Sequence, residues 1–254
     1  MKTFWQTIWV ALSMYSRLPV PRAEWNSKNM RYALCALPLV GVFSGALLWL
    51  WDWLCRALEP GEMLLGAGVV LLPILVTGGI HMDGFCDTCD ALASHGDREK
   101  KLAIMKDSNA GAVLGCACYL LFYFALASQW KTGGTWAFLM GLAMVLERAL
   151  AGLSLCLMPC ARNSGLARIF ADGAAKKNTG IFLIFVAILA FCGLVFVGKM
   201  VGGLMGLAAF LLWLWYDAWA KKELGGITGD LQGYFVQLCE MGQLAVLVFA
   251  TLAL

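Results

Sequence analysis

Long apolar runs dominate this chain, and short polar segments separate them. Runs of about 18 or more mostly apolar residues are long enough to cross a bilayer as helices. Seven such runs cover residues 33–51, 63–81, 110–129, 135–158, 179–198, 200–219 and 235–254. The fifth and sixth runs meet at Lys199 and Met200, so they form a tight hairpin. The pattern predicts an all-α fold: a polytopic membrane helical bundle with about seven transmembrane helices, forming one integral membrane domain over residues 1–254.

The N-terminal segment has a different, amphipathic pattern. Its apolar residues recur at helical spacing beside polar ones: Phe4, Trp5, Ile8, Trp9 and Leu12. Residues 1–22 lack a clear small-residue cleavage site of the kind that ends a signal peptide. An aromatic stripe of this kind is typical of a helix that lies in the membrane interface. We therefore expect a retained N-terminal interfacial helix.

Composition and charge place the chain in a membrane and orient it. It is 61% hydrophobic and 14% charged, well outside the range of soluble globular domains, so the lipid bilayer is its first partner. With the N-terminus in the cytoplasm, fifteen Lys and Arg residues fall on that side and three on the other. This asymmetry predicts a protein of the bacterial cell (inner) membrane whose N-terminus and polar loops are cytoplasmic. We expect no nucleic-acid partner.

The ten cysteines lie mostly inside apolar segments, where cysteine serves as a small packing residue rather than as part of a disulfide scaffold.

The candidate chemistry is concentrated between Gly78 and Gly111, a stretch with five aspartates and both histidines of the chain. Asp83, Asp87 and Asp90 stand at i, i+4 and i+7, so on a helix they project from one face. Adjacent carboxylates repel each other unless a cation lies among them, and Mg²⁺ is held by a few carboxylates plus substrate phosphates. The alternative is a solvated acidic helix end. Against it, the intervening residues look packed: Gly84, Phe85, Cys86, Thr88 and Cys89.

A zinc site is a second alternative for the same stretch. It would use His81, Cys86, Cys89 and His95, since C-x-x-C is common in zinc sites. Such sites usually add a second C-x-x-C or a closely spaced histidine pair, and the sequence has neither. The thiols are therefore expected to pack.

Two segments offer groups that suit phosphate. Lys106, Asp107 and Ser108 stand where the third membrane helix begins, and Ser108 or Asn109 can cap it, so that its N-terminus presents amide donors. Thr228 and Gly229 precede the last helix in the same way, although a simple turn explains the glycines there equally well.

The last helix carries acids on one face. Asp230, Gly233, Gln237 and Glu240 share that face by helical spacing. An isolated ionised Glu240 inside the bilayer is costly, so this face is expected to point into the bundle and to complete the metal site begun by Asp83.

Glu147 and Arg148 lie in the middle of the fourth helix. As sequence neighbours they are not expected to face each other, so each needs a partner from another helix. A structural ion pair is at least as good an interpretation as a direct role.

Several of these motifs together resemble one family. GGIHMDGFCDTCDAL followed by RE-x-x-L-x-IMKDS-x-x-G, over residues 78–111, is similar to the signature of the cobalamin synthases, the adenosylcobinamide-GDP ribazoletransferases. The resemblance continues in SRLPVP at 16–21, in AR-x-x-GL at 161–166, and in GG-x-TGD-x-x-G at 225–233 with Glu240. It therefore spans the whole chain in order.

The resemblance implies the last condensation of coenzyme B12 assembly. A hydroxyl of α-ribazole, or of its 5′-phosphate, attacks the phosphate joined to cobinamide in adenosylcobinamide-GDP, and GMP leaves. Mg²⁺ would be the cofactor, held by carboxylates at Asp83, Asp87, Asp90, Asp230 and Glu240. Phosphate would be bound by Arg98, Lys106, Ser108, Arg162, Thr228 and Gly229. One of the first three aspartates, or Asp107, would take the hydroxyl proton.

The chain departs from the family pattern at three positions. It has Ala91, Cys160 and Gln237 where family members often have Gly, Tyr and an acid. The main carboxylates are unaffected, but the roles of Gln237 and of the 159–168 loop depend on the structure.

Two other functions compete with this hypothesis. A metal or cation transporter would use intramembrane Glu147, Arg148 and Glu240, but transporters place binding residues near the bilayer midplane, whereas most acids here lie toward one surface. Another membrane phosphotransferase of CDP-alcohol type would need a D-G-x-x-A-R pattern. The residues after Asp83 and Gly84 are Phe85, Cys86 and Asp87, so that pattern is absent.

Overall fold

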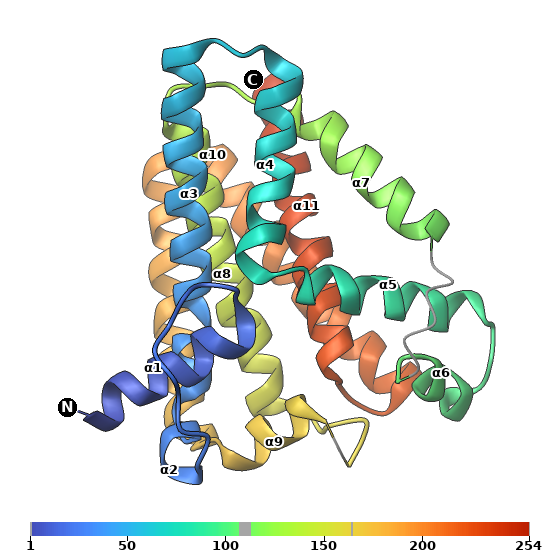
Figure 1. Cartoon of the computed structure of the whole chain (residues 1–254). Helices are drawn as coiled ribbons and strands as arrows, with labels where there is room; N and C mark the ends of the chain where they lie inside the picture. The colour runs from blue at the N-terminus through green and yellow to red at the C-terminus, as the bar shows by residue number, and fades with distance from the viewer. Residues whose placement is uncertain (1, 107–112, 164, 254) are drawn as a thin grey trace.

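The computed structural model describes residues 2–106, 113–163 and 165–253. Over those residues it contains helices and no strand, which confirms the predicted all-α fold (Figure 1). The short elements are α1 (Lys2–Tyr15), α2 (Ser27–Met30), the 3₁₀ helix η1 (Ala33–Ala36), α5 (Ile80–Ala93), α6 (Arg98–Ile104), α7 (Val113–Ala127) and α9 (Leu166–Gly173). The longer ones are α3 (Leu37–Leu58), α4 (Glu62–Thr77), α8 (Thr135–Leu157), α10 (Lys176–Leu224) and α11 (Gly229–Ala253).

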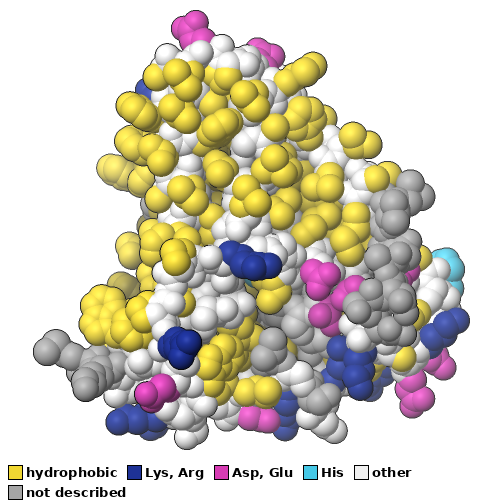
Figure 2. All heavy atoms as spheres, viewed as in Figure 1, with side chains coloured by type: hydrophobic (Ala, Val, Ile, Leu, Met, Phe, Trp, Pro, Cys, Tyr) yellow, Lys and Arg dark blue, Asp and Glu magenta, His cyan; other side chains and the backbone are white. Residues whose placement is uncertain are grey.

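Helix α8 forms the centre of the bundle. Its residues 146–156 are all buried, because α3, α10 and α11 pack around it. Side chains that face outward from these helices are large and apolar, for example Trp53, Phe196 and Phe249. Hydrophobic side chains cover the upper part of the face in Figure 2, over α3, α4 and α7, and most charged side chains gather toward the lower end. This is the surface expected of a protein embedded in a bilayer.

The described residues include several helices that are long and apolar enough to span a membrane. Four pass by length and composition: Ala33–Leu58, Thr135–Leu157, Lys176–Leu224 and Gly229–Ala253. A fifth span is reached if α4 and α5, which meet at an angle of 95°, count as one. Lys176–Leu224 counts once here although its chain is interrupted at Lys199, and neither α4, with 16 residues, nor the apolar part of α7 passes alone. The predicted count of about seven spans stays a prediction.

The predicted hairpin between the fifth and sixth apolar runs is confirmed within α10. Lys199 has a φ of 49° and a ψ of −122°, which interrupts the helix there. Gly202 then lies against the carbonyl of Leu194, and Gly206 against the ring of Phe191. Residues eight or fifteen apart in a straight helix would be about 12 Å or more from each other. The chain therefore reverses at Lys199, and the two limbs of α10 lie side by side.

The N-terminal segment forms a helix, as predicted, and α1 runs obliquely across the lower part of the bundle (Figure 1). Phe4 and Trp5 are exposed, whereas Val10, Ala11 and Leu12 are buried against the rest of the chain. The location of this helix in a membrane interface stays a prediction.

Candidate active site at the crossing of α5 and α11

The site begins at the bend between α4 and α5. Gly78 and Gly79 have φ values of 65° and 82°, a left-handed backbone that a residue with a Cβ rarely adopts. Their conformation turns the chain by 95°, so that α5 does not continue along the direction of α4. The helix that carries the aspartate row therefore lies beyond the lower end of α4 and crosses α11 (Figure 1).

Helices α5 and α11 cross in direct backbone contact. A Cβ added at Gly84 would lie 2.6 Å from the carbonyl oxygen of Asp230, and one added at Gly233 would lie 2.7 Å from that of His81. Only glycine allows an approach this close. The two glycines therefore bring Asp83 of α5 and Asp230 of α11 to one place, and both side chains line the same cavity.

The aspartate row lies on a helix, as its spacing predicted. Asp83 is exposed, and Asp87 and Asp90 are half-buried on α5. The pKa of Asp87 is raised to about 6, first by burial and then by the neighbouring charges of Asp83, Asp230 and Asp90, against a lowering effect of Arg162. The four carboxylates are therefore close enough to repel one another.

The acids do not converge on one point. Among the described residues, no group of three or more His, Cys, Asp or Glu side chains is arranged to hold a metal ion by itself. The assignment of Asp83, Asp87, Asp90 and Asp230 as metal ligands thus stays a prediction.

Arg162 is brought to the acids by a short backbone pairing. The amide of Ala161 donates to the carbonyl of Ile227 (2.8 Å), and the amide of Ile227 donates to that of Pro159 (2.9 Å). This pairing ties the loop after α8 to the segment before α11. Arg162 Nη1 then lies 3.3 Å from Asp230 Oδ2, and its Nη2 donates to the carbonyl of Leu102 (2.7 Å).

The segment before α11 forms a helix cap. The hydroxyl oxygen of Thr228 accepts a hydrogen bond from the amide of Leu231 (3.1 Å), so Thr228 caps the start of α11. Gly229 is exposed at this N-terminus, and a Cβ there would meet nothing within 4 Å. Thr228 and Gly229 both line the cavity.

A cavity of about 310 Å³ opens beside this crossing. Its polar lining consists of His81, Asp83, Arg162, Arg168, Thr228, Asp230 and Gln232. Its remaining lining consists of Met14, Tyr15, Leu37, Ile80, Ala151, Leu155, Cys160, Gly165, Ala167, Ile227, Gly229 and Val236. The charged groups, Arg162 excepted, come from α5, α9 and α11, and the apolar ones largely from α1, α3 and α8.

The structure describes some of the other residues that were predicted to bind phosphate, but not all of them. The guanidinium of Arg98 lies directly against Gly225, at the end of α10. Lys101 pairs with Glu223 (3.0 Å), which holds α6 near the same end. Lys106 is exposed just after α6. Asp107 and Ser108 lie outside the described residues.

Glu240 is not brought to the aspartates. It lies ten residues after Asp230 on α11, about 15 Å along the helix axis. Its Oε1 accepts a hydrogen bond from the Tyr123 hydroxyl (2.7 Å), and its Oε2 lies 3.8 Å from Arg148 Nη2. The structure therefore places Glu240 in a separate, buried polar cluster.

The expectation that Glu147 and Arg148 do not contact each other was wrong. Arg148 Nη1 donates to Glu147 Oε1, because both long side chains turn toward the same side of α8. The expected partners from another helix are also present, since Gln243 donates to Glu147 Oε2 (3.2 Å) and Glu240 pairs with Arg148. A structural ion pair is thus the better interpretation of these two residues.

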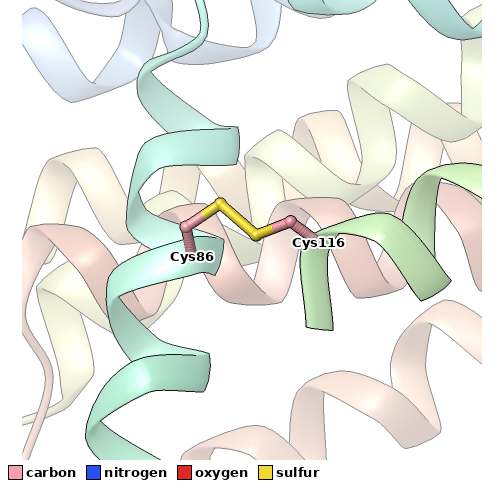
Figure 3. Close-up of a disulfide and its surroundings, with 2 residues drawn as sticks. All are labelled: Cys86 and Cys116. Carbon is pink, nitrogen blue, oxygen red and sulfur yellow. A yellow bond between two sulfur atoms is a disulfide. The ribbon is translucent and has the colours of Figure 1, made fainter. Parts of the chain in front are cut away.

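One pair of cysteines also differs from the expectation. Cys86 of α5 and Cys116 of α7 form a disulfide (Figure 3), whereas both were expected to be packing residues. The bond joins the aspartate helix to the next apolar helix and removes Cys86 from any zinc site. The two cysteines are 30 residues apart, and this spacing did not predict a disulfide, because their pairing depends on how α5 and α7 approach each other in space.

The sequence also missed the position of His81. The sequence predicted at most a zinc ligand here, but the His81 side chain is buried and lines the same cavity as Asp83, two residues further along α5. Its Nδ1 has no hydrogen-bond partner among the described residues.

Fold and site together define a helical membrane protein with an acidic, arginine-lined cavity at one end of its bundle. A family model described as cobalamin-5-phosphate synthase matches residues 7–248, and the chain belongs to this family. It is 36% identical to an adenosylcobinamide-GDP ribazoletransferase of Lachnoclostridium phytofermentans, over 95% of this chain and 93% of that one. It is 32% identical to the enzyme of the same name from Pseudomonas putida, over 92% and 94%. No solved structure matches the chain.

Proposed function

We propose that this protein joins adenosylcobinamide-GDP to α-ribazole, or to α-ribazole 5′-phosphate, with release of GMP. This reaction is the final condensation of coenzyme B12 synthesis. One observation carries the proposal at the level of chemistry: Asp83 and Asp230 come from different helices to the mouth of one cavity, where Arg162 supplies a cation. Family membership and the names of the relatives point to the same reaction. Neither supports transport, and the intramembrane charges are paired with each other.

The reaction makes one phosphoester bond and breaks one phosphoanhydride bond. A hydroxyl oxygen of the ribazole attacks the phosphate attached to cobinamide, and the bond from that phosphorus to the oxygen of GMP breaks. Phosphoryl transfer depends mainly on positioning and on neutralising the charge of the phosphates. Arg162, half-buried beside Asp230, is placed to neutralise charge on the pyrophosphate, and Arg98 and Lys106 add cations near the same end.

A carboxylate is needed to accept the hydroxyl proton. Only two carboxylates line the cavity among the described residues, Asp83 and Asp230. Asp230 already accepts from Arg162, whereas Asp83 has no salt-bridge partner in the described ranges. We therefore assign a carboxylate oxygen of Asp83 as the acceptor of the proton from the ribazole hydroxyl.

The donor set suits Mg²⁺. This ion prefers oxygen ligands and is commonly bound by one or two carboxylates, with the remaining positions taken by water and substrate phosphates. Mutual repulsion among Asp83, Asp87, Asp90 and Asp230, seen in the raised pKa of Asp87, is relieved by a cation. When bound, Mg²⁺ would neutralise charge on the pyrophosphate and on departing GMP.

The proposed orientation of the protein in the membrane follows from the distribution of its Lys and Arg residues. Nucleotide substrates are made in the cytoplasm, and the positive-inside count assigns the aspartate stretch and its cavity to that face. We therefore propose that catalysis takes place at the cytoplasmic surface of the inner membrane.

Turnover by purified protein tests the function. The protein in detergent receives adenosylcobinamide-GDP and α-ribazole 5′-phosphate, or α-ribazole, with Mg²⁺ or with EDTA, and cobamide and GMP are quantified. We expect equal amounts of both products with Mg²⁺ and none with EDTA. Failure of folded protein to form product from either ribazole would reject the function, and undiminished turnover in EDTA would reject the metal.

A further inference from the structure

The cavity is too small for both proposed substrates. Small-molecule sites range over about 300–1,000 Å³, and this cavity, at about 310 Å³, stands at the lower limit. Such a volume suits one nucleoside. The corrinoid nucleotide is several times larger than a nucleoside, so at most its phosphate end can reach the cavity mouth.

The lining changes from charged to apolar with depth. Asp83 and Gly229 are exposed, which places them at the mouth. Away from the mouth, the lining includes four apolar residues of α3, α8 and α11 that are each at most 4% exposed: Leu37, Ala151, Leu155 and Val236. A group bound at the closed end is therefore surrounded by hydrocarbon and excluded from water. This environment fits a flat aromatic ring and does not fit a phosphate or a sugar.

Two polar side chains of the lining have unused hydrogen-bonding atoms. His81 is only 7% exposed, and its Nδ1 has no partner in the described part of the chain. Both side-chain amide atoms of Gln232 also lack a hydrogen-bond partner among the described residues. A buried polar group without a partner costs about 1–3 kcal/mol, so such groups usually face a water or a ligand. Here both belong to the lining of one cavity.

From these features we infer that the cavity is the α-ribazole site, with the aromatic base enclosed by Leu37, Ala151, Leu155 and Val236 and the ribose beside Asp83. His81 and Gln232 belong to the same lining, and the corrinoid stays outside the mouth. The inference rests on the proposed function and adds to it which substrate the cavity selects. It also implies that residues of α3 and α8 determine which aromatic base of the ribazole is accepted. These residues are far from the aspartate row in the sequence.

Filling the closed end tests the inference. Ala151→Leu adds three carbons to the wall and is expected to raise the KM for α-ribazole at least tenfold, with the KM for adenosylcobinamide-GDP within twofold of wild type. Ala187→Leu on α10 is the matched control, since Ala187 is half-buried outside the cavity lining. An unchanged KM for α-ribazole, or an equal rise for both substrates, would overturn the inference while leaving the function intact.

Enlarging the closed end provides the converse test, in case the filled variant does not fold. Leu155→Ala is expected to shift the ratio of kcat/KM toward a riboside with a bulkier base, such as naphthimidazole, about tenfold relative to α-ribazole. An unchanged ratio in a folded variant would contradict the inference.

Direct binding separates this inference from the function itself. Equilibrium dialysis of radiolabelled α-ribazole against the protein needs no turnover. Saturable binding to wild type that Ala151→Leu weakens and Ala187→Leu retains supports the site, even if no condensation is observed. Equal binding to all three proteins, or to none, overturns it.

Discussion

Two groups of carboxylates lie along α11, and they differ in what neutralises them. Glu240 is 1% exposed and contacts Tyr123 and Arg148, which also holds Glu147. About 15 Å away, Asp230 has Arg162 as a partner, but the three aspartates of α5 beside it face one another. The first group carries its own cation, and the second has more negative charge than the described residues balance.

The difference distinguishes a carboxylate cluster with a structural role from one with a proposed catalytic role. A buried charge must be paired, and the contacts of Arg148 with Glu240 and of Gln243 with Glu147 hold α8 and α11 together. Clustered acids that stay unpaired at a cavity mouth are kept at a cost to stability, which is typical of a functional site. Each of the following predictions tests one side of this comparison, beginning with the largest effect.

Asp83→Asn should reduce turnover about 10³-fold, since it removes the proposed proton acceptor with little change in shape. Turnover in detergent with Mg²⁺ provides the measurement, and an unchanged melting temperature shows that the fold is kept. Glu62→Gln, at the exposed start of α4, is the control and should retain full turnover. Wild-type turnover by the Asp83 variant would remove this residue from the site.

Arg148→Met should lower the free energy of unfolding by about 3–5 kcal/mol, because Glu147 and Glu240 lose their buried cation. The matched control is Arg168→Met. Arg168 pairs with Asp172 at 2.7 Å in an exposed position, so its loss should cost no more than about 1 kcal/mol. Unfolding of both variants in mixed micelles compares them, and equal losses would show that the buried cluster is not structural.

Gly84→Ala should cost about 1–3 kcal/mol and reduce turnover about tenfold, since the added Cβ forces α5 away from the Asp230 carbonyl. Gly203→Ala is the control, because a Cβ there meets only the Val195 side chain at 3.8 Å. Melting temperature and turnover are measured for both. Full activity of the Gly84 variant would mean that the close crossing is not needed to align the two helices.

Asp87→Asn should slightly stabilise the metal-free protein. The pKa of Asp87 is raised to about 6 in the folded state, above its unfolded value, so the folded state binds more protons and loses stability as pH rises through about 6. In EDTA the variant should melt above wild type near pH 7.5, with a smaller difference near pH 5. Mg²⁺ should reverse the order near pH 7.5, since it stabilises the charged cluster. A variant that melts below wild type in EDTA near pH 7.5 contradicts the argument.

Much of the local structure was predictable from the sequence. The spacing of Asp83, Asp87 and Asp90 fixed their common face as soon as α5 formed, because helical geometry depends only on neighbours within two turns. The reversal at Lys199 followed from a charge between two apolar runs. Family motifs carried the functional hypothesis, since each is a short contiguous string.

The ends of the individual helices were less predictable. Hydropathy marks apolar residues but not where a helix ends, and α4 ends at Gly78, where the backbone becomes left-handed. The apolar run predicted over 63–81 therefore stops short and turns into α5.

The sequence by itself determined the helical membrane fold, the aspartate face and the family. Only the tertiary structure decided which polar groups meet: Arg162 with Asp230, Glu240 with Arg148 rather than with the aspartates, Cys86 with Cys116, and His81 within the cavity. The physical reason is that periodicity sets the direction of a side chain from its own helix, but not the depth at which another helix crosses it. Here that depth is fixed by Gly84 and Gly233, whose lack of a side chain lets two backbones touch.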